Sequence, residues 1–422
     1  MNKAKTLLAG TFSAMKHRNY RLFWTGEALS LTGTWVQGIA QSWLVLELTH
    51  SAFKLGLVAM AQFLPMLLLS LYAGTLVDRY KKRNILLISQ GALLLLALIL
   101  AILTQFHWVR FWHILILAFL LGIINTIAVP ARQSYFIELV GKEDILNAIA
   151  LNSSIFNLSR ILGPAIGGLL IGWVGLAPCF YINAASYVPV LITLLMIPAT
   201  VAPLTPRPKP QNLQRIYAGI LQGLRYIRRR DTLKYPILLL ALLSAFTMNY
   251  NVMIPLYAQE TLGQSATGYG FLMTIMAIGS FLGSITLAAR SKEPPRFGYI
   301  LTTAAGMASM VLLMGFLDRY YLAALTLLIT GYFAMLFTAL INSTLQLHSS
   351  DRVRGRVNSV YSLVLGGLTP IGSFYAGSLI EAYGAGFCLI TSGALGLLAT
   401  VYVAYGHRKE NQRPLRKPRR NP

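Results

Sequence analysis

Long uncharged runs are the feature that most constrains how this chain of 422 residues can fold. The stretch 55–77 holds 23 consecutive residues without a charge, and 85–103 holds another 19. A helix needs roughly 20 apolar residues to cross the hydrocarbon core of a bilayer. With 55% hydrophobic and only 12% charged residues, the chain lies far from the usual composition of soluble proteins. The sequence therefore predicts an integral membrane protein.

Twelve apolar segments of this kind predict an all-α polytopic membrane protein with twelve transmembrane helices. The segments are 20–47, 55–77, 85–105, 111–137, 145–174, 177–198, 235–260, 267–289, 297–317, 321–347, 356–380 and 386–405. The first of them is too long and too interrupted by polar residues for a cleavable signal peptide, so we expect it to remain in the membrane.

A Pro-rich polar stretch, ATVAPLTPRPKPQN, divides the segments into two sets of six. The halves look like weak repeats, as in transporters built from duplicated units, because LTHSAFKLGL pairs with LGQSATGYGF. Apolar residues recur every three or four positions over 213–227, which predicts an amphipathic helix on the cytoplasmic face. The predicted parts are an N-terminal six-helix bundle (1–198), a cytoplasmic linker with that helix (199–234), a C-terminal six-helix bundle (235–407) and a basic cytoplasmic tail (408–422).

The basic residues are distributed unequally between the two sides of the membrane. If the N-terminal tail is cytoplasmic, 32 of the 36 Lys and Arg residues lie on the cytoplasmic side. Only Lys54, Arg110 and Arg319 then lie outside, and Arg160 lies within a segment. This asymmetry predicts that both termini are cytoplasmic. The net charge of +23 therefore indicates contact with anionic lipids of the cytoplasmic leaflet, and no nucleic acid partner.

The first segment carries a stripe of polar residues on one side of its helix, spanning about 80°. The stripe consists of Glu27, Ser30, Thr34, Gln37 and Gln41. Such a stripe either lines a cavity or forms a hydrogen-bonded seam between helices. Glu27 is its only carboxylate and lies near the cytoplasmic end, so we expect water to reach it. We interpret Glu27 as the proton-coupling group.

Arg160 is the most deeply placed charge. It lies 15 residues after Ile145, which is about 22 Å along a helix and past the middle of a membrane core about 30 Å thick. Its partner is then a polar cavity, a carboxylate or the carbonyls of a broken helix, and its role is an ion pair or a contact with an anionic substrate. Gly163 and Pro164 follow it and predict a flexible point in the helix.

Three amide side chains in other segments, Asn125, Asn251 and Asn342, are further candidates for the wall of a substrate cavity. Arg132, in the same segment as Asn125, is another candidate, and because it lies near the cytoplasmic end its role is either in the cavity or in the loop.

The sequence contains no pattern of metal ligands or catalytic nucleophiles. We therefore expect the protein to have no enzymatic activity and no cofactor site. The two cysteines, Cys179 and Cys388, fall at equivalent positions of the two halves. Because repeat-related positions lie on opposite sides of such a molecule, we expect free thiols.

The stretch Gly74–Leu86, GTLVDRYKKRNIL, resembles the signature loop between helices 2 and 3 of the major facilitator superfamily of transporters. The resemblance extends over nearly all of 15–405. Several further motifs resemble the branch of enterobactin exporters and macrolide efflux proteins: HRNYRLFW at 17–24, PAR at 130–132, RILGP at 160–164, and RGRV at 354–357.

This resemblance implies two bundles around a central cavity, alternating access, and a monomer in the bacterial inner membrane that exports small molecules as protons enter. By the same resemblance, Asp78 would lie near the start of the eleventh helix and hold the outward-open state. The residues implied in gating are Gly74, Asp78, Arg79, Lys82, Arg83, Gly163 and Pro164.

The predicted function is therefore export of a siderophore, a drug or another small, anionic or amphipathic metabolite. Two alternatives stay open at this point. One is a lipid or lysophospholipid flippase on the same fold, and the other is a transport-inactive membrane sensor or assembly factor.

Overall fold

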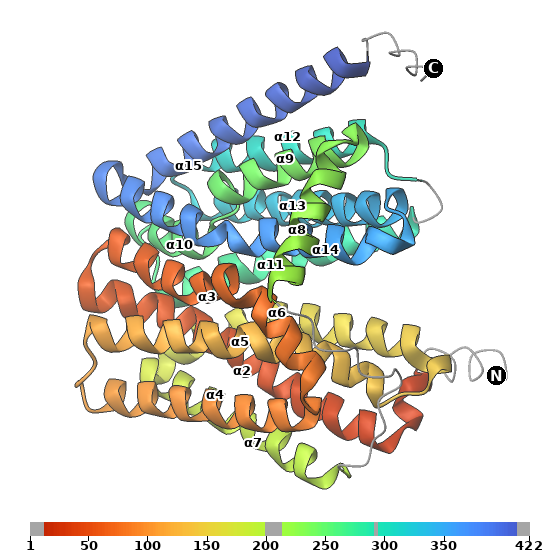
Figure 1. Ribbon diagram of the computed structural model, residues 1–422. Coiled ribbons are helices and arrows are strands. Elements are labelled where there is room, and N and C mark those ends of the chain that lie inside the picture. Colours follow the sequence, from red (N-terminus) through yellow and green to blue (C-terminus); the bar gives the residue numbers. More distant parts are fainter. Residues whose placement is uncertain (1–11, 199–212, 291–293, 412–422) are drawn as a thin grey trace, which may run out of the picture.

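The computed structural model describes residues 12–198, 213–290 and 294–411, and every regular element in these ranges is helical (Figure 1). In chain order the helices are η1 (Ser13–Lys16), α2 (Arg18–Thr49), α3 (Ala52–Arg79), α4 (Lys82–Gln105), α5 (Phe111–Glu138), η2 (Lys142–Asp144), α6 (Ile145–Val174), α7 (Leu176–Met196), α8 (Leu213–Arg228), α9 (Asp231–Phe246), α10 (Tyr250–Leu256), η3 (Tyr257–Thr261), α11 (Ala266–Ala289), α12 (Phe297–Met314), α13 (Tyr320–His348), α14 (Asp351–Gly367) and α15 (Thr369–Asn411). The predicted linker stretch 199–212 and tail residues 412–422 lie outside the described residues.

Among these residues, ten stretches are long and apolar enough to cross a membrane. One stretch, Asp231–Thr261, runs through α9, α10 and η3, and another, Val353–Glu410, runs through α14 and α15. The ten do not include α2, although it has 32 residues. The polar stripe lowers the mean hydropathy of α2. Polar residues are tolerated in a membrane helix that packs against other helices on several sides.

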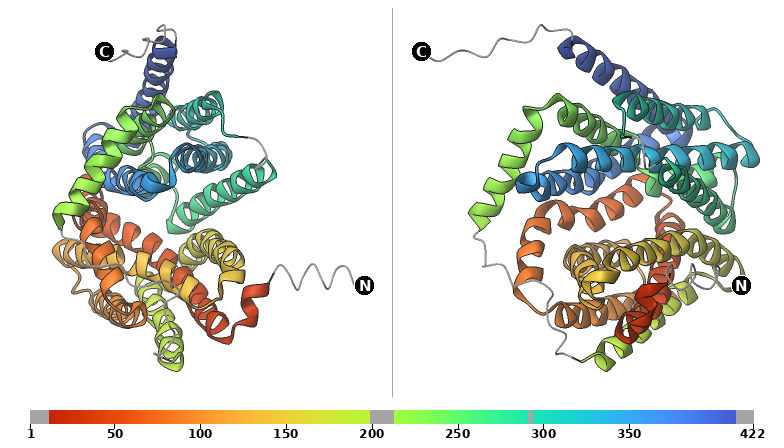
Figure 2. Two further views of the ribbon diagram at one scale, coloured as in Figure 1. Left: turned by 45° about the vertical axis from the view of Figure 1, so that its right-hand side comes forward. Right: turned by 90° about the vertical axis from the view of Figure 1, so that its right-hand side faces the viewer.

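The helices before residue 198 form one half of the molecule and those after residue 213 form the other, as the two separate groups in Figures 1 and 2 show. The halves meet where α3 packs along α15 and α6 packs along α11. Glycines face each other at both contacts: a Cβ added to Gly56 would lie 2.9 Å from the Cα of Gly377, and one added to Gly168 would lie 3.1 Å from the Cα of Gly270. The absence of side chains lets the backbones approach closely.

Polar contacts close this junction at the end of the molecule opposite the chain termini. The carboxylate of Glu381 accepts hydrogen bonds from Ser51 Oγ and the Phe53 backbone N–H, all at 3.1 Å. Trp43 stacks on Tyr269 at the same end, with ring centroids 6.2 Å apart. The two halves are therefore joined at the end where α2 turns into α3 (Figure 1).

The predicted segment 235–260 lies within one apolar stretch, Asp231–Thr261, but its helix is broken between Phe246 and Tyr250. Side chains at the break bond to the backbone. Thr247 Oγ1 donates to the Ser392 carbonyl at 3.1 Å, and Asn249 Nδ2 donates to the Ala245 carbonyl at 3.1 Å. Such bonds offer the backbone an alternative to the helical pattern. The break places the short helix α10 at the interface between the halves.

The predicted helix 356–380 is also divided, since α14 ends at Gly367 and α15 starts at Thr369. Pro370 lies in the first turn of α15, where the missing N–H costs nothing. In contrast, the predicted loop between the segments that end at 380 and start at 386 is a single non-helical residue in the structure. Only Gly384, with φ 82°, leaves the helical conformation there, and glycine tolerates that positive φ.

The predicted amphipathic helix is present as α8, and it packs against α14. Gln222 Oε1 accepts a hydrogen bond from Arg356 Nη1 at 2.5 Å, and Gly223 lies against the Arg356 backbone. Leu221 and Leu224 remain exposed. Ile227, on the same face, is buried, so the described end of this face is only partly covered by protein, as expected for a helix lying along a membrane surface.

The last helix continues past the predicted bundle boundary at 407 and reaches Asn411. Its end is bound to the start of α9, because Lys234 Nζ lies 2.9 Å from Glu410 Oε2 and the Tyr235 hydroxyl also donates to that carboxylate. Residues 408–411 of the predicted tail are therefore helical.

Candidate functional site

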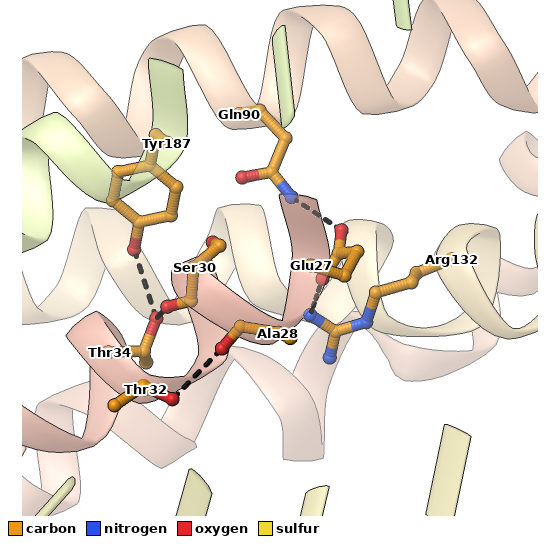
Figure 3. Close-up of polar contacts among 8 residues, drawn as sticks. All are labelled: Glu27, Ala28, Ser30, Thr32, Thr34, Gln90, Arg132 and Tyr187. Carbon is orange, nitrogen blue, oxygen red and sulfur yellow. Dashed lines mark hydrogen bonds and ion pairs between the residues drawn. The ribbon is translucent and has the colours of Figure 1, made fainter. Parts of the chain in front are cut away.

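Glu27 of α2 is fully buried. Its carboxylate faces Gln90 and Arg132 (Figure 3). Its Oε2 accepts from Arg132 Nη1 of α5 at 3.1 Å, and its Oε1 accepts from Gln90 Nε2 of α4 at 3.1 Å. The expectation that water reaches Glu27 is wrong, because α7 and α6 pack along α2 and the partners from α4 and α5 cover the carboxylate. Arg132, for which the sequence left a cavity role and a loop role open, pairs with Glu27.

This pairing is what physical chemistry demands of a buried carboxylate. An isolated charge without water costs several kcal/mol, so a buried ion requires an opposite charge and hydrogen bonds. The side chain of Glu27 is 0% exposed and that of Arg132 is 20% exposed, so the pair reaches the surface only through the arginine. Both residues are charges within apolar segments, and that shared property is the signal by which their pairing could have been predicted.

The polar stripe of α2 turns one edge toward α7. Thr34 Oγ1 lies 3.3 Å from the Tyr187 hydroxyl, and Gln37 Oε1 accepts from Asn183 Nδ2 at 2.6 Å. The same stripe also faces open space, since Thr34, Gln37 and Gln41 line a cavity. Both interpretations of the stripe therefore apply, because Thr34 and Gln37 bond to α7 and also line the cavity.

The cavity has a volume of about 220 Å³ and lies between the two halves. It combines amide side chains with aromatic ones. From the sequence, we expected five of its residues: Thr34, Gln37, Gln41, Asn125 and Asn251. Further polar and aromatic wall residues that the sequence did not single out are Gln62, Asn183, Trp35 and Phe63. Asn342 lines neither this cavity nor the next one, because it bonds to Gln346 along α13 at 2.5 Å.

Arg160 lines a second cavity of about 140 Å³ that shares Trp35, Asn251 and Met273 with the first. Arg160 Nη2 donates to Asn157 Oδ1 at 3.3 Å, and the buried Nε has no hydrogen-bond partner. Among the described residues, no carboxylate pairs with Arg160, and the ion pair of Glu27 is with Arg132. The two deep charges are therefore separate.

Comparison with known proteins decides the family. Residues 9–414 match the family described as transmembrane secretion effector. The chain belongs to this family of the major facilitator superfamily.

Relatives of this transporter span most of its length. It is 26% identical over 419 residues to the enterobactin exporter EntS of Escherichia coli O1:K1, covering 95% of this chain and 96% of that protein. It is 25% identical over 375 residues to the staphyloferrin A transporter of Staphylococcus aureus, covering 86% and 90% of the two chains. It is 26% identical over 360 residues to the multidrug efflux pump Tap of Mycolicibacterium fortuitum, covering 83% and 87%.

Solved structures agree on the fold of the transporter. The nucleoside transporter NupG superposes with a TM-score of 0.74 at 11% identity, over 92% of this chain and 98% of that one. A bacterial homologue of the iron transporter ferroportin in an inward-facing state gives a TM-score of 0.68 at 17% identity, over 92% and 98%. At these identities the likeness concerns the fold alone.

The superfamily loop after α3 holds the predicted gating residues. Gly74, Asp78 and Arg79 are exposed. Within the described part of the chain, Asp78 has no hydrogen-bond or ion-pair partner, so its contact with the eleventh helix stays a prediction. Lys82 Nζ lies 3.0 Å from Glu138 Oε1, and Arg83 Nε donates to the Leu194 carbonyl at 2.7 Å. These two basic residues tie the start of α4 to α5 and α7.

Gly163 and Pro164 lie where α6 approaches both α2 and α11. The helix is continuous through Pro164. A Cβ added to Gly163 would lie 3.2 Å from the Thr32 carbonyl oxygen and would collide with Trp35. In the transporter, Gly163 therefore permits a close approach of α6 to α2 within the first half, and the Pro164 carbonyl lies against Gly270 of α11 in the second half. The role of both residues in gating stays a prediction.

The predicted free state of the cysteines is confirmed, since Cys179 and Cys388 are both free and buried. In the described ranges, no group of three or more His, Cys, Asp or Glu side chains could hold a metal ion.

Proposed function

We propose that the protein exports a small molecule across the bacterial inner membrane by alternating access, coupled to proton entry. The observation that carries the proposal is a cavity between the two halves with several amide side chains in its wall, in a protein that also holds a buried Glu27–Arg132 pair. Relatives named as exporters of enterobactin and of drugs support export over a lipid flippase or an inactive sensor.

The proposed topology is twelve transmembrane helices in two six-helix bundles. The ten apolar stretches supply ten of them. We add α2, which is long enough to span, and divide Val353–Glu410 at Gly384. With the charge asymmetry, both termini are cytoplasmic. The junction through Glu381 is then on the outer side, so this state opens toward the cytoplasm. An unpartnered Asp78 is what we expect of such a state, because its proposed contact belongs to the outward-open one.

Proton coupling is assigned to Glu27. A buried carboxylate has two ways to avoid an unpaired charge: it can pair with Arg132, or it can take up a proton. A proton arriving at Glu27 would release Arg132 from the pair. The exchange changes the contacts between α2 and α5, which both contribute to the cavity wall. Substrate contacts are assigned to Thr34, Gln37, Gln41, Asn125 and Asn251. The partners are a small-molecule substrate, protons and anionic lipids, and the working unit is a monomer.

The first experiment compares small molecules released by cells that express the protein with those released by an Asp78→Asn variant at matched membrane abundance, including iron-limited growth. A compound enriched only with the intact protein supports export. Equal release profiles in all growth conditions, together with no uptake or efflux of that set of compounds in proteoliposomes, would contradict it.

The second experiment tests coupling with the compound so identified. In proteoliposomes with an imposed pH gradient, Glu27→Gln should transport without acceleration by the gradient. Glu47→Gln is the matched control, because Glu47 is an exposed carboxylate on the same helix. A normal response of Glu27→Gln to the gradient would show that Glu27 is not the coupling group.

A further inference from the structure

The cavity around Arg160 contains a cation that no acidic side chain in the described part of the chain neutralises. The nine residues that line it are Trp35, Arg160, Pro164, Tyr250, Asn251, Met273, Met276, Ala277 and Ser280. None of these is acidic. The only hydrogen bond from the guanidinium within the described residues goes to the neutral amide of Asn157, and its buried Nε has no partner. An unpaired charge at this depth is costly, so such residues mark sites where another charge binds.

A second hydrogen-bond donor in the cavity is also unused. The hydroxyl of Tyr250 is buried and has no hydrogen-bond partner. Tyr250 and Asn251 open α10, immediately after the break in the seventh predicted segment. That break therefore brings a phenol and an amide to the wall that Arg160 lines from α6. The two halves of the molecule each contribute donors to one small space.

The donor set has a definite chemical preference. A guanidinium presents several N–H groups in a plane and matches the two oxygens of a carboxylate or the oxygens of a phosphate. Two orphaned donors in one pocket would both be satisfied by an anion with two or more oxygens, whereas a neutral apolar group would leave both unpaired.

The neighbouring cavity fixes what surrounds the anionic group. Trp35, Asn251 and Met273 belong to both walls, so one ligand can occupy the two spaces together. The larger cavity adds aromatic residues, Phe63 and Tyr269, and several amides. A ligand that places its charge at Arg160 would therefore place an aromatic or apolar body against Trp35 and into the larger cavity.

We propose that Arg160, with Tyr250 and Asn251, forms a subsite for the anionic group of an amphipathic organic anion whose body lies in the larger cavity. This inference deepens the proposed export function, because it assigns the substrate class of the same central cavity. Both halves supply the subsite, so the anion would bridge α6 and α10 across the interface that alternating access must rearrange.

The test measures binding of two probes that differ in charge but share a body. Isothermal titration of the purified full-length protein compares 4-phenylbutyrate with the neutral 4-phenylbutyramide. Charged hydrogen bonds of this kind correspond to a preference for the anion of roughly 10- to 100-fold. Arg160→Gln should reduce the preference to about one, and Arg160→Lys should keep part of it, because lysine retains the charge and loses the planar fork.

Arg319→Gln is the matched control, since it removes the same charge from an exposed position. It should keep the wild-type preference. An equal affinity of wild type for both probes, or a preference that survives in a folded Arg160→Gln variant, would overturn the subsite. Thermal unfolding of each variant verifies folding, and Arg160→Lys provides a second measurement if the glutamine variant is unstable.

Two sources of the anion are separated by competition. Displacement of phenylbutyrate by oleoyl lysophosphatidate would extend the subsite to lipid phosphates, and lack of displacement would limit it to soluble carboxylates. Both outcomes support an anion subsite. The binding measurement is independent of transport. A preference for the anion without export would support the subsite and refute the proposed exporter. Export without that preference would support the exporter and refute the subsite.

Discussion

The Glu27–Arg132 pair predicts an unequal response to removing its two members. Replacement of Arg132 by Gln leaves a carboxylate that is 0% exposed with Gln90 as its remaining partner. Breaking a buried pair in this way costs about 3–5 kcal/mol of folding free energy. Replacement of Glu27 by Gln leaves an arginine that is 20% exposed and can turn toward water. We expect that change to cost about 1–3 kcal/mol, the penalty of an unsatisfied polar group.

The double variant distinguishes this account from a simple loss of packing. With both charges replaced by amides, no buried ion remains, so Glu27→Gln/Arg132→Gln should be more stable than Arg132→Gln alone. A coupling energy of about 1–3 kcal/mol is the expected size for residues in direct contact.

The assay is unfolding of the purified protein in mixed micelles with increasing sodium dodecyl sulfate, followed by loss of ellipticity at 222 nm. Arg319→Gln serves as the control and should change stability by less than about 0.5 kcal/mol, because its side chain is exposed. The reasoning is refuted if the two single variants lose equal stability and the double variant loses their sum.

Three further predictions concern the junction and the cytoplasmic end. Glu381→Gln weakens the acceptor of the hydrogen bond from the Phe53 backbone N–H, so amide hydrogen exchange at Phe53 should accelerate. An unchanged exchange rate would mean that this contact does not hold the outer end closed. Gly168→Ala places a Cβ 3.0–3.2 Å from the backbone of α11 and should lower the free energy of unfolding by about 1–3 kcal/mol. The control, Gly91→Ala, meets nothing within 4 Å and should be neutral or stabilising. Equal effects of the two variants on thermal unfolding would contradict this. Hydrogen bonds from the Ser13 and His17 side chains hold the pKa of Asp144 below its ordinary value. Its stabilisation is therefore complete above about pH 4 and is lost as the pH falls through the lowered pKa. Asp144→Asn should make the melting temperature less dependent on pH below about pH 4, and an unchanged dependence in acid would show that the bonds are absent in solution.

Helix positions were largely predictable because they depend on local sequence. An uncharged run of about 20 residues has no stable conformation in a bilayer other than a hydrogen-bonded helix, and the charges that flank it mark where it ends. Ten apolar spans follow from that rule alone. The same rule failed at Thr247–Asn249, because the hydrogen bonds that stabilise the break include one to Ser392, 145 residues away.

The sequence predicted several residues of the candidate site but not which side chains they contact. The amides Gln37, Gln41, Asn125 and Asn251 were recognised because polar side chains in a membrane helix need a cavity or another helix. Glu27 was expected in water and is buried, since its exposure depends on α4 and α5. Its proposed role as the coupling group remains a prediction.

The sequence by itself determined that this chain lies in a membrane, which segments are helical, and which side chains are too polar to face lipid. Only the tertiary structure decided that Glu27 pairs with Arg132, 105 residues away, and that no carboxylate of the described residues pairs with Arg160. The physical reason is that helix formation and membrane insertion depend on neighbours along the chain, whereas neutralising a buried charge depends on which helices pack together, and packing is a property of the whole fold.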